Sequence, residues 1–245
     1  MRFLLALLLF AAALFGEYDT RLDNYPQART LYQEATIKKD PTAAFRLARF
    51  YEDTLKDDRQ VIYWYEKSYE YGSFKAAHNL GAFYEDKLKN YSKAIEWYEK
   101  AYARGDLYKA PLALGLAYKA LKDYPKAIEW YEKAYAHGDI GGATNLGYLY
   151  ESVLKKTTDG IKWYRKAAKN GDGDAIKNLG NTYHDQGDNV KGAAYILAMA
   201  EYGYTRQEVF DFLKNDWKID QETLKKAYEL QLKLDIPKHY TGGID

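Results

Sequence analysis

The chain has 245 residues, of which 47% are hydrophobic and 29% charged, a balance typical of globular proteins and not of disordered ones. The charges of its 36 basic and 35 acidic residues nearly cancel, so the sequence lacks the positive charge by which nucleic-acid-binding proteins attract phosphate. Binding to acidic polymers and to anionic lipid surfaces is disfavoured for the same reason. The absence of cysteine excludes disulfides and a lipid-anchored N-terminal cysteine.

The N-terminus has the pattern of a secretory signal peptide. Arg2 precedes a run of 13 apolar residues, which Gly16 and an acidic segment follow. The run is shorter than the roughly 20 residues that span a bilayer. Cleavage after Ala13 or Gly16 fits the pattern, and we favour Gly16 because the acidic segment then starts the mature chain. We therefore predict a signal peptide at residues 1–16, secretion across the inner membrane to the periplasm, and no membrane insertion after cleavage.

A 33-residue period organises the chain that follows. A tryptophan opens each period, and a glycine follows it by eight residues. A second motif, centred about 16 residues after the tryptophan, reads HNLGAFY, LALGLAY, TNLGYLY or KNLGNTY. A degenerate copy at 45–51 precedes these, after a partial helix at 28–38, and a last copy at 192–203 has Tyr195 in place of tryptophan. The tryptophans are Trp64, Trp97, Trp130 and Trp163, and the glycines are Gly72, Gly105, Gly138 and Gly171, with Gly203 following 32 residues later.

Both motifs have helical spacing. Ile95, Tyr98 and Tyr102 fall at i, i+3 and i+7 and share one apolar face. Gly81 and its equivalents lie in mid-helix, where glycine costs about 1 kcal/mol relative to alanine, so we expect close helix approach there. Gly72 and its equivalents are expected to end helices in the left-handed conformation. Since one helix pair cannot bury its own apolar face, the period predicts an all-α fold, a right-handed α-solenoid of antiparallel helix pairs.

Tyrosine is the most unusual feature of the composition, with 26 copies against 9 phenylalanines. Twelve of them occupy three fixed positions in the two motifs. We interpret them as rings packed between adjacent helices with the hydroxyl reaching the edge, in preference to an aromatic platform for a ligand.

The pattern A-x-x-W-Y-x-K-A-x-x-x-G followed by A-x-x-x-L-G-x-x-Y resembles the Sel1-like repeat of the tetratricopeptide superfamily, over roughly residues 25–203. Sel1-like repeats usually carry a longer Gly-rich loop between the two helices than the short DKLKN and KALKD loops of this chain. We therefore expect the array, residues 17–203, to curve more like a tetratricopeptide stack. The resemblance implies a protein that mediates protein–protein assembly and is not an enzyme.

The period stops after Gly203, and residues 204–245 are predicted to form a helical cap with a short tail. Thr205 and Glu208 form a capping-box pattern that opens a helix. Its residues Val209, Phe210 and Leu213 are expected to point inward. Asp220 is expected to cap a second helix with Leu224, Ala227, Tyr228 and Leu234, which Pro237 ends. A docking helix for a partner is the alternative role of this segment.

The predicted binding site is the concave groove lined by the first helix of each pair. By analogy with the tetratricopeptide pattern, its exposed positions lie three residues before, one after and four after the recurring glycine. The middle of this groove is apolar and its ends are polar, which suits a peptide or a partner helix, although any solvated helix face is mixed in this way. The predicted groove residues are Phe45, Arg49, His78, Glu85, Leu112, Leu116, Lys119, Tyr148, Glu151, Lys177, Asn181 and His184.

The sequence indicates no catalytic residues, cofactor or metal site. The four histidines, His78, His137, His184 and His239, fall in four structural units, and no two have the i, i+4 spacing of a zinc site. His137 takes a helix-terminal position and is interpreted as a surface cap. Phosphate-binding loops and nucleophile elbows are absent from the sequence, and the repeated glutamates fall on the solvated face.

Two hypotheses follow. The first is an exported scaffold or adaptor that binds another protein in a bacterial cell-envelope assembly. The second is a cell-wall-directed enzyme or binder, acting on a β-lactam or a muropeptide, as implied by a cysteine-rich Sel1-like subfamily. That subfamily pairs cysteines across each repeat, and this chain has none. We favour the scaffold for this reason.

Overall fold

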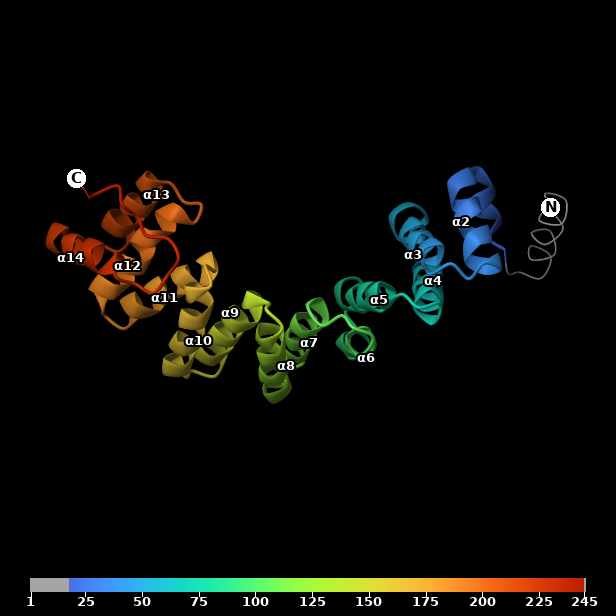
Figure 1. The fold of residues 1–245 in the computed structure, drawn as a ribbon, viewed down its shortest axis with the longest axis horizontal. Helices are drawn as coiled ribbons and strands as arrows, with labels where there is room; N and C mark the ends of the chain where they lie inside the picture. Colours follow the sequence, from blue (N-terminus) through green and yellow to red (C-terminus); the bar gives the residue numbers. More distant parts are fainter. Residues whose placement is uncertain (1–17, 245) are drawn as a thin grey trace. The chain divides into compact units, whose positions relative to one another are not determined.

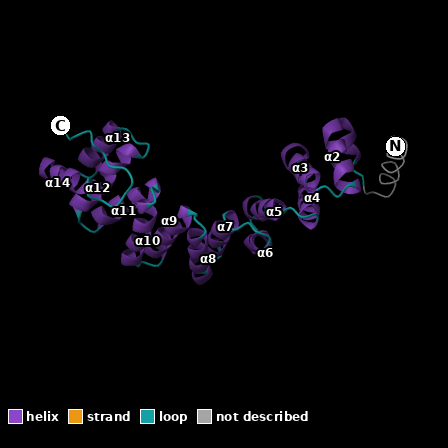
Figure 2. Ribbon diagram, viewed as in Figure 1, coloured by secondary structure: helices purple, strands orange, loops and turns teal. Residues whose placement is uncertain are grey.

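The computed structural model describes residues 18–244, and all regular structure within this range is helical (Figure 2). The predicted signal peptide at residues 1–16 lies outside the described residues. Across the part that is described, no helix combines the length and the apolar character needed to cross a membrane.

The chain divides into two compact units that meet in sequence at Asp106 and Leu107. In both units, consecutive helices pack against each other, which confirms the predicted all-α fold of helix pairs (Figure 1). The N-terminal unit contains η1 (Thr20–Asn24), α2 (Pro26–Ile37), α3 (Pro41–Phe50), η2 (Tyr51–Leu55), α4 (Asp58–Glu70), α5 (Phe74–Asp86) and α6 (Tyr91–Ala103). The C-terminal unit contains α7 (Lys109–Ala120), α8 (Tyr124–Ala136), α9 (Ile140–Tyr148), η3 (Leu149–Val153), α10 (Thr157–Lys169), α11 (Gly173–Asp185), α12 (Asn189–Ala198), η4 (Met199–Glu201), α13 (Arg206–Asp211), η5 (Phe212–Asp216) and α14 (Gln221–Gln231).

Two kinds of left-handed turn alternate along the chain. After each tryptophan-bearing helix, a glycine adopts the left-handed conformation, as predicted, with a φ of +116° at Gly72 and +106° at Gly105. Between the two helices of a repeat, a lysine adopts this conformation, with a φ of +51° at Lys89 and +61° at Lys122. In the last repeat this second position is Gly187, with a φ of +81°. The lysines at this position are Lys56, Lys89, Lys122 and Lys155.

The mid-helix glycines allow a tyrosine ring of the following helix to lie against the backbone. A Cβ atom added to Gly81 would come within 2.7 Å of two carbons of the Tyr98 ring. The ring of Tyr131 meets Gly115 in the same way, and both tyrosines are buried. The predicted close approach is therefore confirmed, and the space left by the missing Cβ is filled by an aromatic ring.

Aromatic rings also join successive repeats. The ring of Tyr69 packs edge-on against Trp97 with centroids 5.5 Å apart, and Tyr135 packs likewise against Trp163 at 5.9 Å. A lysine covers the exposed side of the indole, as where Lys166 Nζ lies 3.6 Å from the centroid of Trp163. These contacts support the interpretation of the aromatic residues as packing.

The C-terminal segment begins as predicted. Thr205 and Glu208 form a complete capping box at α13, and Asp220 caps α14. The prediction that Pro237 ends the second helix is wrong, because α14 already ends at Gln231. The buried Gln231 side chain donates to the carbonyl oxygen of Tyr240 at 2.6 Å and accepts from its N–H at 3.1 Å, which draws the tail back onto the helix. The predicted boundary between array and cap, after residue 203, stays a prediction.

Candidate protein-binding site

Seven of the predicted groove residues lie on three helices of the C-terminal unit that contact one another in succession, α7, α9 and α11. Two of the seven, Lys177 and His184, contact the C-terminal segment, and the other five form one surface. Three of them fall at i, i+4 and i+7 on α7 and so share one stripe of the helix. We call this surface the α7–α9–α11 face. Its residues are Leu112, Leu116, Lys119, Tyr148 and Asn181.

Tyr148 is the exposed aromatic residue of this face. Its side chain is 47% exposed, whereas Tyr131 and Tyr164 of the neighbouring helices are buried. The Lys119 ammonium lies 5.4 Å from the centroid of the Tyr148 ring, which joins α7 to α9. The Cδ2 atom of Leu112 also reaches α9, 3.6 Å from the Cβ position of Gly141. The face therefore offers partly exposed apolar side chains with a cation beside them.

Glu151, predicted to line the groove, is engaged within the fold. One of its carboxylate oxygens accepts a hydrogen bond from the Tyr164 hydroxyl at 3.1 Å, and the other accepts one from the Thr182 hydroxyl. The bond to Thr182 joins η3 to α11.

His184, at the end of the predicted groove, is covered by the C-terminal segment. Its ring stacks on the indole of Trp217 with centroids 3.9 Å apart and an interplanar angle of 4°. Its Nδ1 lies 2.8 Å from the side-chain oxygen of Asn189. Lys177 also contacts the segment, since its ammonium donates to the Tyr204 hydroxyl at 3.0 Å. Both residues are thus contacts between α11 and the cap.

The other predicted groove residues lie in the N-terminal unit, on α3 and α5. Phe45 is half-buried, and Arg49 is exposed and pairs with Asp53 at 3.0 Å. His78 Nδ1 lies 2.8 Å from an Asp106 carboxylate oxygen. Glu85 accepts a hydrogen bond from the Tyr98 hydroxyl at 2.8 Å. Each of these contacts is made within the unit.

A tyrosine–glutamate hydrogen bond recurs in three repeats, and sequence reasoning missed it. The tyrosine that follows the tryptophan donates its hydroxyl to a glutamate 13 residues earlier. Burial is the main cause that raises the pKa of the Tyr98 hydroxyl, and burial also raises the pKa of the Glu85 carboxyl above its usual value. In the third repeat, Lys119 stands at the position of the glutamate. The pairs are Tyr65–Glu52, Tyr98–Glu85 and Tyr164–Glu151.

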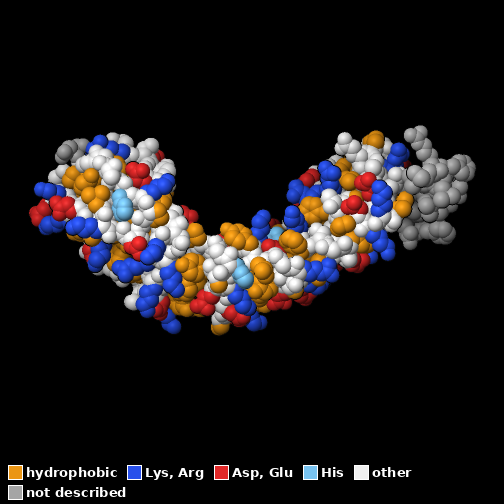
Figure 3. All heavy atoms as spheres, viewed as in Figure 1, with side chains coloured by type: hydrophobic (Ala, Val, Ile, Leu, Met, Phe, Trp, Pro, Cys, Tyr) orange, Lys and Arg blue, Asp and Glu red, His pale blue; other side chains and the backbone are white. Residues whose placement is uncertain are grey.

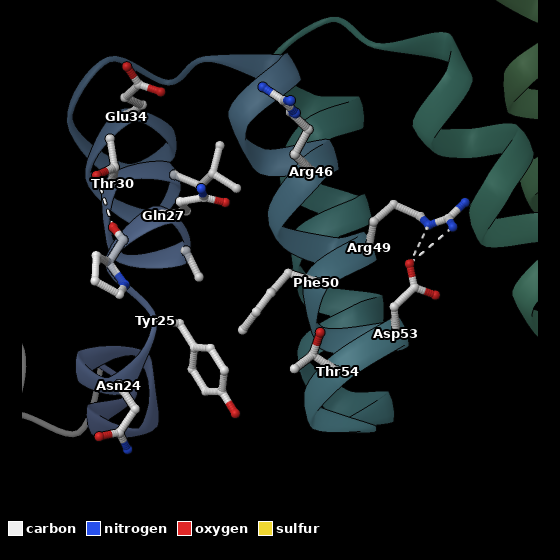
Figure 4. A pocket seen from close by; sticks show the side chains of 13 residues that line it. Asn24, Tyr25, Gln27, Thr30, Glu34, Arg46, Arg49, Phe50, Asp53 and Thr54 are labelled. Carbon is white, nitrogen blue, oxygen red and sulfur yellow. Dashed lines mark hydrogen bonds and ion pairs between the residues drawn. The ribbon is translucent and has the colours of Figure 1, made fainter.

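A cavity of about 1000 Å³ lies between α2 and α3 and was not predicted (Figure 4). The rings of Tyr25 and Phe50 meet edge to face in it at 5.0 Å. Arg46 and Arg49 of α3 also line it, and the Arg49 guanidinium turns toward Asp53 (Figure 4). Phe50 is half-buried here, although Phe83, which takes the same position one repeat later, is 3% exposed.

A second cavity of about 540 Å³ lies in the C-terminal unit, where α13 and η5 meet α11 and α12. Lys177 is its only predicted groove residue. The apolar lining residues are Ile196, Met199, Val209 and Phe212, and the polar ones are Lys177, Tyr204, Glu208, Asp211, Asn215 and Asp216.

Over residues 18–244, His, Asp and Glu side chains form no cluster of three or more that is able to hold a metal ion. His137 caps the C-terminus of α8 and is exposed, as predicted. His239 lies 2.9 Å from the carbonyl oxygen of Leu234 in the tail. On the visible surface of each unit, basic and acidic side chains are interspersed, which agrees with the neutral composition (Figure 3).

The chain matches the Sel1 repeat in four consecutive stretches, which together cover just over half of its length. No sequence among the curated proteins matches it. The matched stretches are residues 41–73, 74–106, 113–139 and 141–172.

Solved structures with the same fold include c5321, a protective antigen of uropathogenic Escherichia coli with an SLR fold, at 27% identity and a TM-score of 0.60. The match covers 84% of this chain and 48% of c5321, so this chain spans about half the length of that antigen. Pseudomonas aeruginosa PilF matches at 18% identity and a TM-score of 0.55, covering 84% of this chain and 93% of PilF. The tetratricopeptide protein YrrB matches at 19% identity and a TM-score of 0.50, covering 76% of this chain and 97% of YrrB.

Proposed function

We propose that this chain, which belongs to the Sel1 repeat family, is an exported scaffold. It binds a protein partner of the bacterial cell envelope through the α7–α9–α11 face. Sel1 and tetratricopeptide repeat proteins are typically scaffolds without enzymatic activity and suit protein–protein interaction. Export and the envelope partner are proposed from the sequence of residues 1–16.

The exposure of Tyr148 is the observation that supports this face most directly. Tyrosine is among the residues that contribute most to binding energy at protein interfaces. Most tyrosines of the repeat motifs are buried or partly buried, whereas Tyr148 leaves 47% of its surface in solvent beside Lys119. Leu112 and Leu116 add partly exposed apolar surface on α7. YrrB, described as having an unusual peptide-binding site, is an example of this fold with such a site.

The binding face is tested by photocrosslinking in cells. A photoreactive phenylalanine analogue at Tyr148 is expected to form a covalent adduct with an envelope protein. The matched control is the same analogue at Tyr63, which is 46% exposed but lies on the tryptophan-bearing helix α4. Equal adducts from both positions, or none from Tyr148, would refute the proposed face.

Export is tested on the same cells by fractionation and by sequencing the N-terminus of the protein. We expect a periplasmic protein that begins at Glu17. An uncleaved chain recovered from the cytoplasm would contradict the proposed localisation and leave the test of the binding face unaffected.

A further inference from the structure

The cavity between α11, α12 and the C-terminal segment combines an apolar floor with an acidic rim. The side chains of Ile196 and Met199 are each 4% exposed, and Val209 is 3% exposed. Because Ile196 and Met199 come from the end of the repeat array and Val209 from α13, the floor forms only where these two parts meet. Methionine is flexible and polarizable, so a floor that contains it adapts to apolar groups of different shape.

The rim carries three carboxylates against one ammonium. Hydrogen bonds from Thr205 lower the pKa of the Glu208 carboxyl, so this group is ionised at neutral pH. Asp211 accepts a hydrogen bond at 2.8 Å from the Gln207 amide, which carries no charge. Asp216 lies at the end of η5, and Lys177 reaches across to the Tyr204 hydroxyl. The side chains that line the cavity therefore carry a net negative charge, although the whole chain has a net charge of +1.

We infer that this cavity binds a segment of the protein partner in which an apolar side chain is flanked by lysine or arginine. The apolar side chain fills the space above Met199, and the flanking cations lie against the carboxylates of Asp211 and Asp216. A volume of about 540 Å³ is within the usual range of ligand cavities. The inference rests on the proposed function, since the segment that it names belongs to the protein partner proposed above.

Met199 supplies a direct probe of the cavity floor. The chain has two methionines, Met1 and Met199, so the protein labelled with ¹³C at the methionine methyl groups gives at most two methionine signals. A Met199→Leu variant assigns the signal from the cavity. Titration with the peptide acetyl-Lys-Leu-Lys-Leu-Lys-amide is expected to shift this signal in a saturable manner.

Two matched peptides separate the contributions of the floor and the rim. Replacing the lysines by glutamate is expected to abolish the shift of the Met199 signal through repulsion, and replacing the leucines by serine is expected to abolish it through loss of the apolar contact. An equal response to the acidic peptide, or no response to the basic one, would overturn the inference. A Met199 signal that moves with protein concentration alone would also overturn it, because a second copy of this chain would then be the occupant.

The rim is tested by an Asp211→Asn/Asp216→Asn variant, which keeps the size of both side chains. We expect the basic peptide to bind it roughly fivefold more weakly, as exposed charge pairs contribute modestly. The control is Glu229→Gln, an exposed carboxylate on α14 outside the cavity, which is expected to leave affinity unchanged. Unchanged affinity in the double variant would refute the role of the rim. A crosslink at Tyr148 without a Met199 shift would refute the cavity alone, and the reverse result would refute the proposed face alone.

Discussion

The ring of Tyr98 lies so close to the backbone of Gly81 that a methyl group has no room between them. A Gly81→Ala substitution gains about 1 kcal/mol of helix propensity but forces the ring or the helix to move, which costs about 1–3 kcal/mol in a packed core. We therefore expect a net loss of stability in urea unfolding. Comparing Glu96→Ala with Glu96→Gly, at an exposed position in the middle of α6, measures the propensity alone. A more stable Gly81→Ala protein would contradict the close contact.

The hydrogen bond between Tyr98 and Glu85 is expected to stabilise the fold. Removing the hydroxyl in Tyr98→Phe leaves the ring contact with Gly81 in place. We expect a loss of about 1 kcal/mol in the free energy of unfolding, since the acceptor stays partly solvated. Tyr164→Phe is expected to cost more, because its acceptor Glu151 is also fixed by Thr182. Unfolding by urea, followed by circular dichroism, measures both variants, and no change in either would exclude a stabilising bond.

The pKa of Glu85, raised by burial, predicts a pH dependence of stability. A carboxyl whose pKa is higher in the folded than in the unfolded state contributes stability below the unfolded value and loses this contribution as the pH rises through the folded one. Glu85→Gln removes this dependence. We therefore expect Glu85→Gln to be more stable than the natural chain at pH 7 and the difference to shrink towards pH 4. A difference that grows on acidification would show that the sign is wrong.

The left-handed lysine at the turn between α5 and α6 is expected to weaken the fold. A residue with a Cβ atom costs about 1–2 kcal/mol in this conformation, whereas glycine adopts it freely but loses more chain entropy on folding. We expect Lys89→Gly to raise the free energy of unfolding by about 0.5–1 kcal/mol. Gly187→Lys is the matched reverse change and is expected to lower it. A loss of stability in Lys89→Gly, or a gain in Gly187→Lys, would refute this account of the turns.

Phe50 and Phe83 occupy the same position in successive repeats but differ in burial. Phe83→Ala is expected to cost about 3–5 kcal/mol, as for other fully buried phenylalanines. Phe50→Ala is expected to cost about half of this, because its ring already faces an open cavity. Urea unfolding of the two variants tests the comparison, and equal losses would mean that the cavity is closed in solution.

The sequence predicted the repeat and its helix ends because both depend on local chemistry. A glycine such as Gly72 is visible in the sequence, and the left-handed turn is the conformation in which it is favoured over other residues. Thr205 and Glu208 are three residues apart, so their capping box was equally visible. Lys89 was not predicted in a left-handed turn, because nothing in its chemistry favours that conformation and only the fit of the two helices imposes it.

The candidate site was less accessible to prediction. The sequence places Glu85 in the predicted groove, but its bond to Tyr98 depends on the tilt of a ring on another helix. The stacking of His184 on Trp217 joins two segments with no shared period. The cavities form where helix α2 and the C-terminal segment depart from the repeat, and a pattern that defines the repeat contains no information about these ends.

The contacts around Tyr98 have a consequence for how such a chain changes in evolution. The contact with Gly81 and the hydrogen bond to Glu85 both close within one 33-residue segment, residues 74–106. Duplicating or deleting a whole segment therefore breaks none of these contacts. It changes only the contacts between neighbouring segments. A gene for this protein is thus free to lengthen or shorten its array in whole units, and with it the number of side chains offered to a partner.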